Sequence, residues 1–136
     1  MSDERVVVTM DSRYRAEFRA LPENGPEPVR VRKIDQMTPY AMMLAGLGSC
    51  TAIVLHTFAA NHGIALERVR IDLRYGRDYR KDCEQCSPDT SYTEKITKHI
   101  ELEGSLTDAD RKKLHRVAEY CPIRKILANG IEVENA

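Results

Sequence analysis

Four cysteines are the residues of this chain best suited to chemistry. Cys50 follows two glycines in the stretch LAGLGSCTAIVLH, and Cys121 precedes a proline in AEYCPIRK. Cys83 and Cys86 form a C-x-x-C pair in a polar segment. A cysteine reacts or binds metal as the thiolate, and the ordinary thiol pKa is about 8.5. Chemistry here therefore requires elements that bring a thiol close to a positive charge, a second thiol or a metal.

Size and composition favour one domain over residues 1–136. The 21 basic and 21 acidic residues cancel, so charge gives no reason to expect nucleic acid or an anionic membrane as a partner. The start, MSDERVVVTM, lacks the basic residues and apolar run of a signal peptide, and we expect a cytoplasmic location. Cytoplasmic thiols are usually reduced, which favours catalytic, redox or metal-binding roles for the cysteines over structural disulfides.

The segment from Gln36 to Leu66 contains no Asp, Glu, Lys or Arg. Thr38-Pro39 is a good helix start and His62-Gly63 a good helix stop, so we expect one long helix that is apolar on all sides. Its length would permit a membrane span. Scattered polar residues favour a core helix instead, covered by a sheet and by a second subunit; these are Ser49, Thr51, His56, Thr57 and Asn61.

Alternating apolar and polar residues predict strands on both sides of this helix. The expected strands cover residues 5–10, 14–20, 28–34, 69–75, 96–103 and, last, 131–134. The polar connection over residues 76–92 is expected to be a loop. Strands, helix, strands, helices and strand in this order indicate an α+β fold.

A second helix is expected after Ser105, with Thr107 and Asp110 as a capping box. Its apolar stripe consists of Leu114, Val117, Ala118 and Cys121. Pro122 disfavours helix at the residue before it, so the helix should kink or restart there and then close at Asn129-Gly130.

Cys50 and Cys121 have two interpretations. Both could be small buried hydrophobic residues, as free cysteines often are. Both could instead be reactive. Gly46 and Gly48 have no side chains to shield Cys50, and Pro122 interrupts the helix directly after Cys121, which could free that thiol to move. A reactive thiol would need a cation, and the early strands offer Arg13, Arg15, Arg19, Arg30 and Arg32.

Three stretches resemble the OsmC/Ohr family of thiol-dependent organic hydroperoxide peroxidases. They are TPYAMMLAGLGSCTAIVL around Cys50, LEGSLTDADRKKL before the second helix, and AEYCPIRKILANGIEVE around Cys121. The resemblance implies an OsmC-like fold, with antiparallel sheets wrapped around a long central helix, and an intertwined homodimer with active sites between subunits.

The resemblance also implies residue roles. Cys50 would be the peroxidatic cysteine and Cys121 the resolving one, with Arg13 or Arg15 as the catalytic arginine. A lipoyl or thioredoxin-like dithiol would reduce the disulfide. The substrate wall would include Tyr40, Met43 and Gly46, within the apolar stretch Met42, Met43 and Leu44. The family's usual glutamate after the helix-opening proline is missing, because Tyr40 and Ala41 occupy those positions.

Cys83 and Cys86 leave three interpretations open: reduced thiols in a solvent loop, a redox pair, or two ligands of a zinc ion. A zinc site would need further ligands, such as His99, Asp82, Glu84 or a residue from a second subunit. The peroxidase chemistry itself requires no cofactor.

Three functions are therefore compatible with the sequence. The first is a peroxidase that uses Cys50 and Cys121 on organic hydroperoxides. The second is a redox-sensing or small-ligand-binding protein on the same scaffold, favoured by the missing glutamate. The third is a zinc-dependent structural module with the metal at Cys83 and Cys86.

Overall fold

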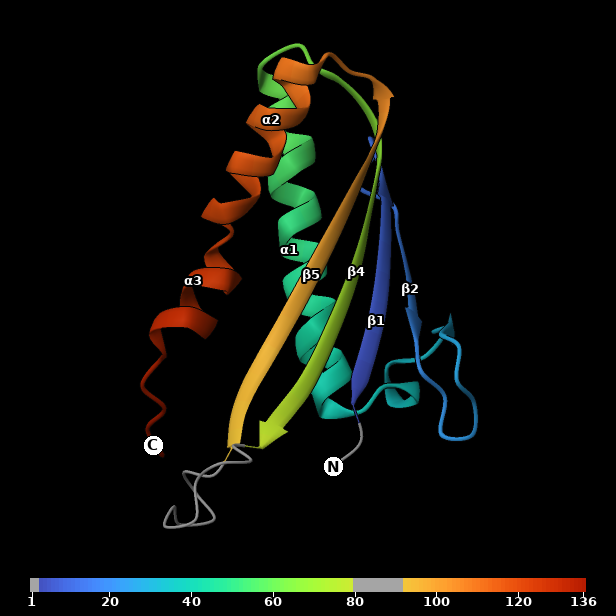
Figure 1. The fold of residues 1–136 in the computed structure, drawn as a ribbon, viewed down its shortest axis with the longest axis vertical. Coiled ribbons are helices and arrows are strands. Elements are labelled where there is room, and N and C mark those ends of the chain that lie inside the picture. Colours follow the sequence, from blue (N-terminus) through green and yellow to red (C-terminus); the bar gives the residue numbers. More distant parts are fainter. Residues whose placement is uncertain (1–2, 80–91) are drawn as a thin grey trace.

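Five antiparallel strands form one sheet in the order β3-β2-β1-β4-β5, and the helices cover one of its faces (Figure 1). The computed structural model describes residues 3–79 and 92–136. In chain order the elements are β1 (Glu4–Asp11), β2 (Ala16–Ala20), β3 (Val29–Arg30), the 3-10 turn η1 (Ile34–Gln36), α1 (Pro39–Asn61), β4 (Ala65–Tyr79), β5 (Tyr92–Ser105), α2 (Asp108–Val117), the 3-10 turn η2 (Ala118–Tyr120) and α3 (Pro122–Asn129). The predicted α+β class is confirmed.

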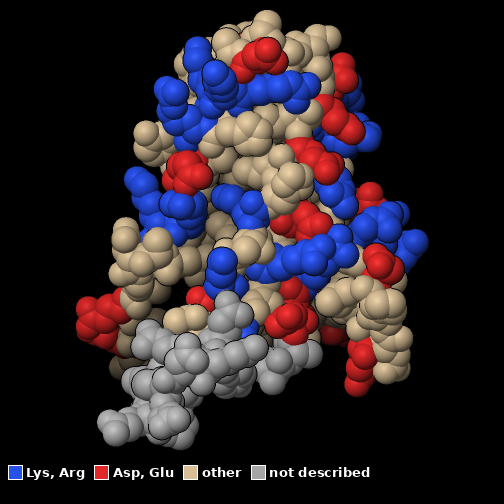
Figure 2. Space-filling view, viewed as in Figure 1, with Lys and Arg blue, Asp and Glu red and all other residues tan. Residues whose placement is uncertain are grey.

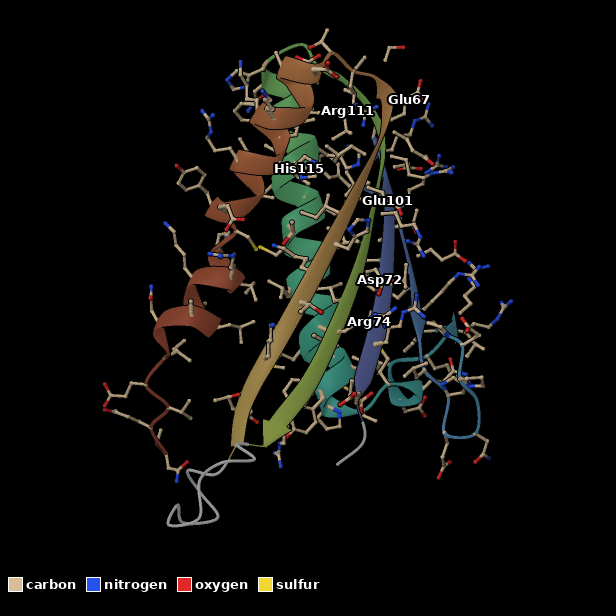
Figure 3. All side chains as sticks on the ribbon, viewed as in Figure 1. Glu67, Asp72, Arg74, Glu101, Arg111 and His115 are labelled. Atoms are coloured by element: carbon tan, nitrogen blue, oxygen red, sulfur yellow. The ribbon has the colours of Figure 1, made fainter. Side chains whose placement is uncertain are left out.

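The two faces of the sheet have opposite chemistry because side chains alternate along each strand. The inner face is apolar and packs on α1; it includes Val6, Val8, Met10, Val69, Ile71, Leu73 and Tyr75, all buried. The outer face has cross-strand ion pairs, such as Arg70 with Glu101 at 3.6 Å and Arg68 with Glu103 at 3.5 Å. Figure 3 labels Asp72, Arg74 and Glu101 along these strands.

Helix α1 begins and ends where the sequence predicts. The Thr38 hydroxyl accepts a hydrogen bond from the Ala41 amide, Pro39 is the first helical residue, and Gly63 has a positive φ of 63° just after the helix. By length and composition α1 could cross a membrane, because its most apolar 18 residues have a mean hydropathy of 1.6. Half of these residues are buried inside the fold, as in the core helix of a globular protein. Within one chain an outward stripe of α1 remains exposed, and its expected cover by a second subunit stays a prediction.

The two glycines in the middle of α1 face different sides: Gly48 faces the sheet, and Gly46 faces outward. At Gly48 a methyl group would stand 2.7 Å from Cδ1 of Leu73 and 2.8 Å from Cγ2 of Val8, so only glycine allows α1 to lie this close to the sheet. At Gly46 an added methyl group would meet nothing within 4 Å. Gly46 belongs to the exposed stripe, together with Met42, Ile53 and Thr57.

The C-terminal helices pack on α1 (Figure 1). Thr107 and Asp110 form the predicted capping box at the start of α2. Arg111 of α2, labelled in Figure 3, donates a hydrogen bond to the Leu102 carbonyl of β5 at 3.1 Å. The helix ends at η2 and restarts as α3 at Pro122, as predicted, and Gly130 closes α3 with a φ of 85°.

Several boundaries differ from the sequence predictions, and three of the differences have a structural reason. The predicted strand 28–34 is limited to Val29–Arg30, and its end forms η1 instead. Residues 76–79 and residue 92, predicted to be loop, extend β4 and β5 because the two strands pair with each other. Residues 131–134, predicted to be a strand, form none, and Val133 is 84% exposed, because they reach no sheet edge of their own chain.

On the face drawn in Figure 2, acidic and basic side chains are interspersed.

Candidate active site

Cys50 and Cys121 are far apart in sequence, but their thiols lie close enough for each to shift the pKa of the other. Cys50 lies in the middle of α1 and is half-buried, whereas Cys121 is fully buried. Cys121 occupies the junction of η2 and α3, where Pro122 requires a new helix start. The expected meeting of the two sulfurs therefore occurs within one chain.

The junction places Cys121 at the amino end of α3. Burial opposes ionisation of this thiol, but hydrogen bonds from the Thr51 hydroxyl, the Arg124 and Ile123 amides and the Cys50 thiol outweigh burial and lower the pKa of Cys121. For Cys50, burial is the largest effect and raises the pKa of its thiol. Within the pair, Cys121 is therefore the thiol that loses its proton more readily.

Lys98 of β5 is the cation that acts on both sulfurs. Its Nζ donates a hydrogen bond to Oγ1 of buried Thr51 at 3.3 Å, and Thr51 is the residue directly after Cys50. Burial lowers the pKa of Lys98, and the negative charge on Cys121 acts in the opposite direction. The sequence contained a signal for this residue, because Lys98 interrupts the apolar alternation of Ile96, Ile100 and Leu102.

An open pocket of about 440 Å³ lies between α1, β5 and α3; neither Cys50 nor Cys121 lines it, but Lys98 does. Its apolar wall includes Met43, as predicted for a substrate wall, and the ionic groups at its edge come from β5 and α3. The complete lining is Met43, Leu47, Tyr75, Glu94, Lys95, Ile96, Lys98, Arg124, Leu127 and Ala128. The pocket can hold an apolar molecule with a polar end.

Tyr40 lies near this pocket but outside its lining. Its ring stacks on Tyr75 at a centroid distance of 4.8 Å, and its hydroxyl accepts a hydrogen bond from Arg77 at 3.4 Å. The Tyr75 hydroxyl donates to Glu94 at 2.7 Å, and this bond raises the pKa of Tyr75. A carboxylate and an arginine thus stand beside Tyr40, but they come from β5 and β4 and not from α1.

Arg13 and Arg15 lie in the turn between β1 and β2. The backbone amide of Arg13 and the side chain of Arg15 both donate hydrogen bonds to the Asp11 carboxylate. The Arg15 side chain is 73% exposed and pairs with Asp11 at 2.8 Å. Neither arginine acts on Cys50 or Cys121 within one chain, where Lys98 supplies the positive charge. Gly46, predicted to line the substrate site, lies on the exposed stripe of α1.

Cys83 and Cys86 lie outside the residues that the structure describes. Their predicted partner His99 is exposed on the outer face of β5, with its Nε2 3.7 Å from Glu101. Among residues 3–79 and 92–136, no three metal-binding side chains gather at one point. His56 is a core residue, as predicted, with Nε2 3.0 Å from the Met10 carbonyl oxygen.

Fold and site together define a helix-on-sheet α+β protein with a half-buried and a buried thiol side by side. Residues 32–135 match the family model described as OsmC-like protein, so the chain belongs to the OsmC-like family, as the sequence resemblance indicated. No curated protein matches the chain.

Solved structures share the fold at low sequence identity. An OsmC-like hydroperoxide resistance protein from Jannaschia sp. CCS1 has a TM-score of 0.68 at 14% identity, covering 99% of this chain and 93% of its own. The organic hydroperoxide resistance protein OsmC from Legionella pneumophila has a TM-score of 0.54 at 15% identity, with 96% and 93% covered. OhrB of Bacillus subtilis has a TM-score of 0.53 at 15% identity, with 98% and 96% covered.

Proposed function

We propose that this protein is a thiol-dependent peroxidase that reduces organic hydroperoxides through Cys50 and Cys121. The observation that carries the proposal is the proximity of the two thiols, each of which acts on the pKa of the other. Family membership and the hydroperoxide resistance proteins among the structural neighbours support the same reaction class.

The different burial of the two thiols suggests their order of action. Cys50 is the more accessible sulfur, so it attacks the peroxide after passing its proton to the Cys121 thiolate. An S–O bond forms at Cys50, the O–O bond breaks, and the leaving alkoxide takes that proton from Cys121 to become the alcohol. Cys50 is now a sulfenic acid and Cys121 is again a thiolate.

The second step closes the disulfide. The Cys121 thiolate attacks the sulfur of the Cys50 sulfenic acid, an S–S bond forms, and the hydroxide that leaves is protonated to water. An external dithiol of the lipoyl or thioredoxin type then reduces the disulfide by thiol–disulfide exchange. No cofactor is required in this scheme.

The apolar pocket suggests the substrate class. Met43 and Leu47 line it on the side of α1, one to two turns from Cys50, which favours an organic hydroperoxide over hydrogen peroxide. Tyr40 adjoins the same region through Tyr75. We propose that Arg13 or Arg15 approaches a thiol pair only in an assembled dimer.

We also propose that the protein is a homodimer located in the cytoplasm. The exposed stripe of α1 supports the dimer, because Met42 and Ile53 are 36% and 43% exposed and Gly46 leaves open space for another backbone. Gly46 would then approach a substrate site from the neighbouring subunit.

Steady-state turnover of cumene or t-butyl hydroperoxide tests the function, with a lipoyl donor and a thioredoxin-like donor run in parallel. Cys50→Ser should abolish turnover, and Cys121→Ser should prevent the disulfide, which appears in the wild type as a loss of about two hydrogens in mass. The matched controls, Cys83→Ser and Cys86→Ser, should keep turnover. Turnover that survives Cys50→Ser would contradict the proposal.

A redox sensor is the second candidate, because Tyr40 and Ala41 replace the family's glutamate at the start of α1. A sensor would give one stoichiometric burst of oxidation without sustained turnover in the same assay. Zinc analysis of protein purified without chelators tests the remaining metal hypothesis at Cys83 and Cys86, and a content below about 0.2 equivalents would exclude it.

A further inference from the structure

A lysine occupies an inward position on the apolar face of the sheet. Lys98 lies between Ile96 and Ile100 on β5, and in the β4–β5 register it is opposite Leu73, which is fully buried. Lysine is rarely buried without a partner, because removing an ammonium group from water is costly. A position that tolerates this cost is a candidate for a functional charge.

The close approach at Gly48 explains why the ammonium group reaches α1. Gly48 allows Leu73 to touch the backbone of α1, and Lys98 is the cross-strand neighbour of Leu73. Its Nζ consequently lies within hydrogen-bond distance of Oγ1 of Thr51, one residue from Cys50.

Thr51 connects the ammonium group to the thiols. Its hydroxyl is fully buried, and it can donate its single proton either to the Leu47 carbonyl, at 2.9 Å, or to the Cys121 sulfur. A hydrogen bond from Lys98 occupies one acceptor position of Oγ1 and leaves that proton available for the sulfur.

The other ionic groups near Lys98 compensate each other. Glu119 of η2 and Arg124 of α3 both act on Lys98, and they form an ion pair with each other at 2.8 Å. Within the described parts of the chain, no carboxylate lies at ion-pair distance from Lys98, and Cys121 is the negative group that acts on it most strongly, ahead of Glu119.

We propose that Lys98 is a positioning residue that holds the Cys50–Cys121 pair singly ionised, acting by its charge and through the Thr51 hydroxyl. The inference rests on the proposed function for its biological meaning, whereas its test requires no peroxide turnover. A positive charge close to a thiol stabilises the thiolate, and an effect of one pKa unit is a tenfold change in the thiolate fraction.

The test measures the rate of alkylation by iodoacetamide between pH 5 and pH 9 on the full reduced chain. Peptide mass spectrometry separates Cys50 and Cys121 from the other two cysteines. Lys98→Met should raise the pH at which alkylation of the Cys50–Cys121 pair reaches half its maximal rate. It should also slow alkylation at pH 7 by about tenfold. Lys98→Arg keeps the charge and should retain a profile close to wild type.

Two further variants separate charge from other effects. Lys98→Gln keeps a donor for Thr51 without the charge, and it should resemble Lys98→Met. Lys113→Met removes an exposed positive charge on α2 and should leave the profile unchanged. The inference is overturned if Lys98→Met and Lys98→Gln, both shown to be folded by circular dichroism, keep the wild-type profile.

The two proposals fail in different ways. Sustained peroxide turnover with an unshifted alkylation profile in the Lys98 variants would remove the role of Lys98 and leave the peroxidase. A shifted profile without any turnover would keep the role of Lys98 in setting the thiol charge and remove the peroxidase.

Discussion

The backbone of Gly48 faces Leu73 at a distance that leaves no room for a side chain. A methyl group at position 48 would stand 2.7 Å from Cδ1 of Leu73, well inside van der Waals contact. Two glycines in the centre of a long apolar helix are costly in helix propensity, at roughly 1 kcal/mol each. At Gly48 this cost is offset by the close packing of α1 on the sheet.

Gly48→Ala is therefore expected to destabilise the fold. Overpacking costs about 1–3 kcal/mol, and alanine returns up to about 1 kcal/mol of helix propensity, so the free energy of unfolding should fall by roughly 1–2 kcal/mol. Urea unfolding measures the change. Gly46→Ala, whose methyl group meets no atom of the chain within 4 Å, is the control and should not destabilise the protomer.

Measurements at several protein concentrations separate any effect of Gly46→Ala on association from its effect on folding. An equal fall in the free energy of unfolding for Gly48→Ala and Gly46→Ala at all protein concentrations would contradict the packing role of Gly48.

Lys98→Met should stabilise the protein at neutral pH. Because burial lowers the pKa of Lys98 in the folded state, the charged lysine opposes folding at every pH below that folded pKa. This cost disappears as the pH rises through the unfolded pKa of about 10.4. The gain in Tm of the variant should thus be full at pH 7 and shrink towards pH 10. A lower Tm than wild type at pH 7 would show that the ammonium group supports the fold.

The Arg5–Asp72 pair should contribute stability with the opposite pH dependence. Arg5 donates two hydrogen bonds to Asp72, at 3.1 and 2.8 Å, and they lower the pKa of Asp72. The stabilisation is present above the unfolded pKa of about 3.9 and is lost as the pH falls through the folded pKa. Asp72→Asn should cost about 2 kcal/mol at pH 7.

The stabilities of wild type and Asp72→Asn should converge when urea unfolding is repeated at falling pH, below the lowered folded pKa of Asp72. Glu103→Gln is the control, because Glu103 pairs with Arg68 on the exposed part of the same sheet face and such pairs contribute about 0–1 kcal/mol. A constant difference between wild type and Asp72→Asn at all pH values would contradict the ionic role of Asp72.

Ile53→Glu should weaken the proposed dimer. Ile53 is 43% exposed on the apolar stripe of α1, and a buried carboxylate without a partner would oppose association. Analytical ultracentrifugation should show a monomer at concentrations where the wild type is dimeric. Ile34→Glu, at a position 69% exposed on η1, is the matched control and should stay dimeric. A monomeric wild type at micromolar concentration would end the dimer proposal.

Local signals in the sequence predicted the elements whose ends depend on one or two residues. Thr38 and Pro39 mark the start of α1, Thr107 and Asp110 cap α2, and Pro122 restarts the helix after Cys121. Each of these features acts within a turn of the chain, so no distant neighbour is needed to specify it.

Features that depend on distant segments were not predictable in the same way. Residues 131–134 have a strand-like alternation but reach no edge of their own sheet, and residues 76–79 look polar but pair with β5. Lys98 interrupts the apolar alternation of β5 in the sequence, but its place beside Cys50 and Cys121 depends on the packing of distant segments. The pairing of Cys50 with Cys121 came from family resemblance, because no periodicity connects positions so far apart.

The hairpin of β4 and β5 extends beyond the part of the sheet that β1 supports. Strand β1 pairs with β4 only as far as Tyr75, whereas β4 and β5 continue together to Tyr79 and Tyr92. Glu94 and Lys95, in one wall of the pocket, belong to this extension, and the opposite wall belongs to the short α3. Substitutions in these two walls can therefore change the size of the ligand that fits without changing the packing of α1 on β1 and β4.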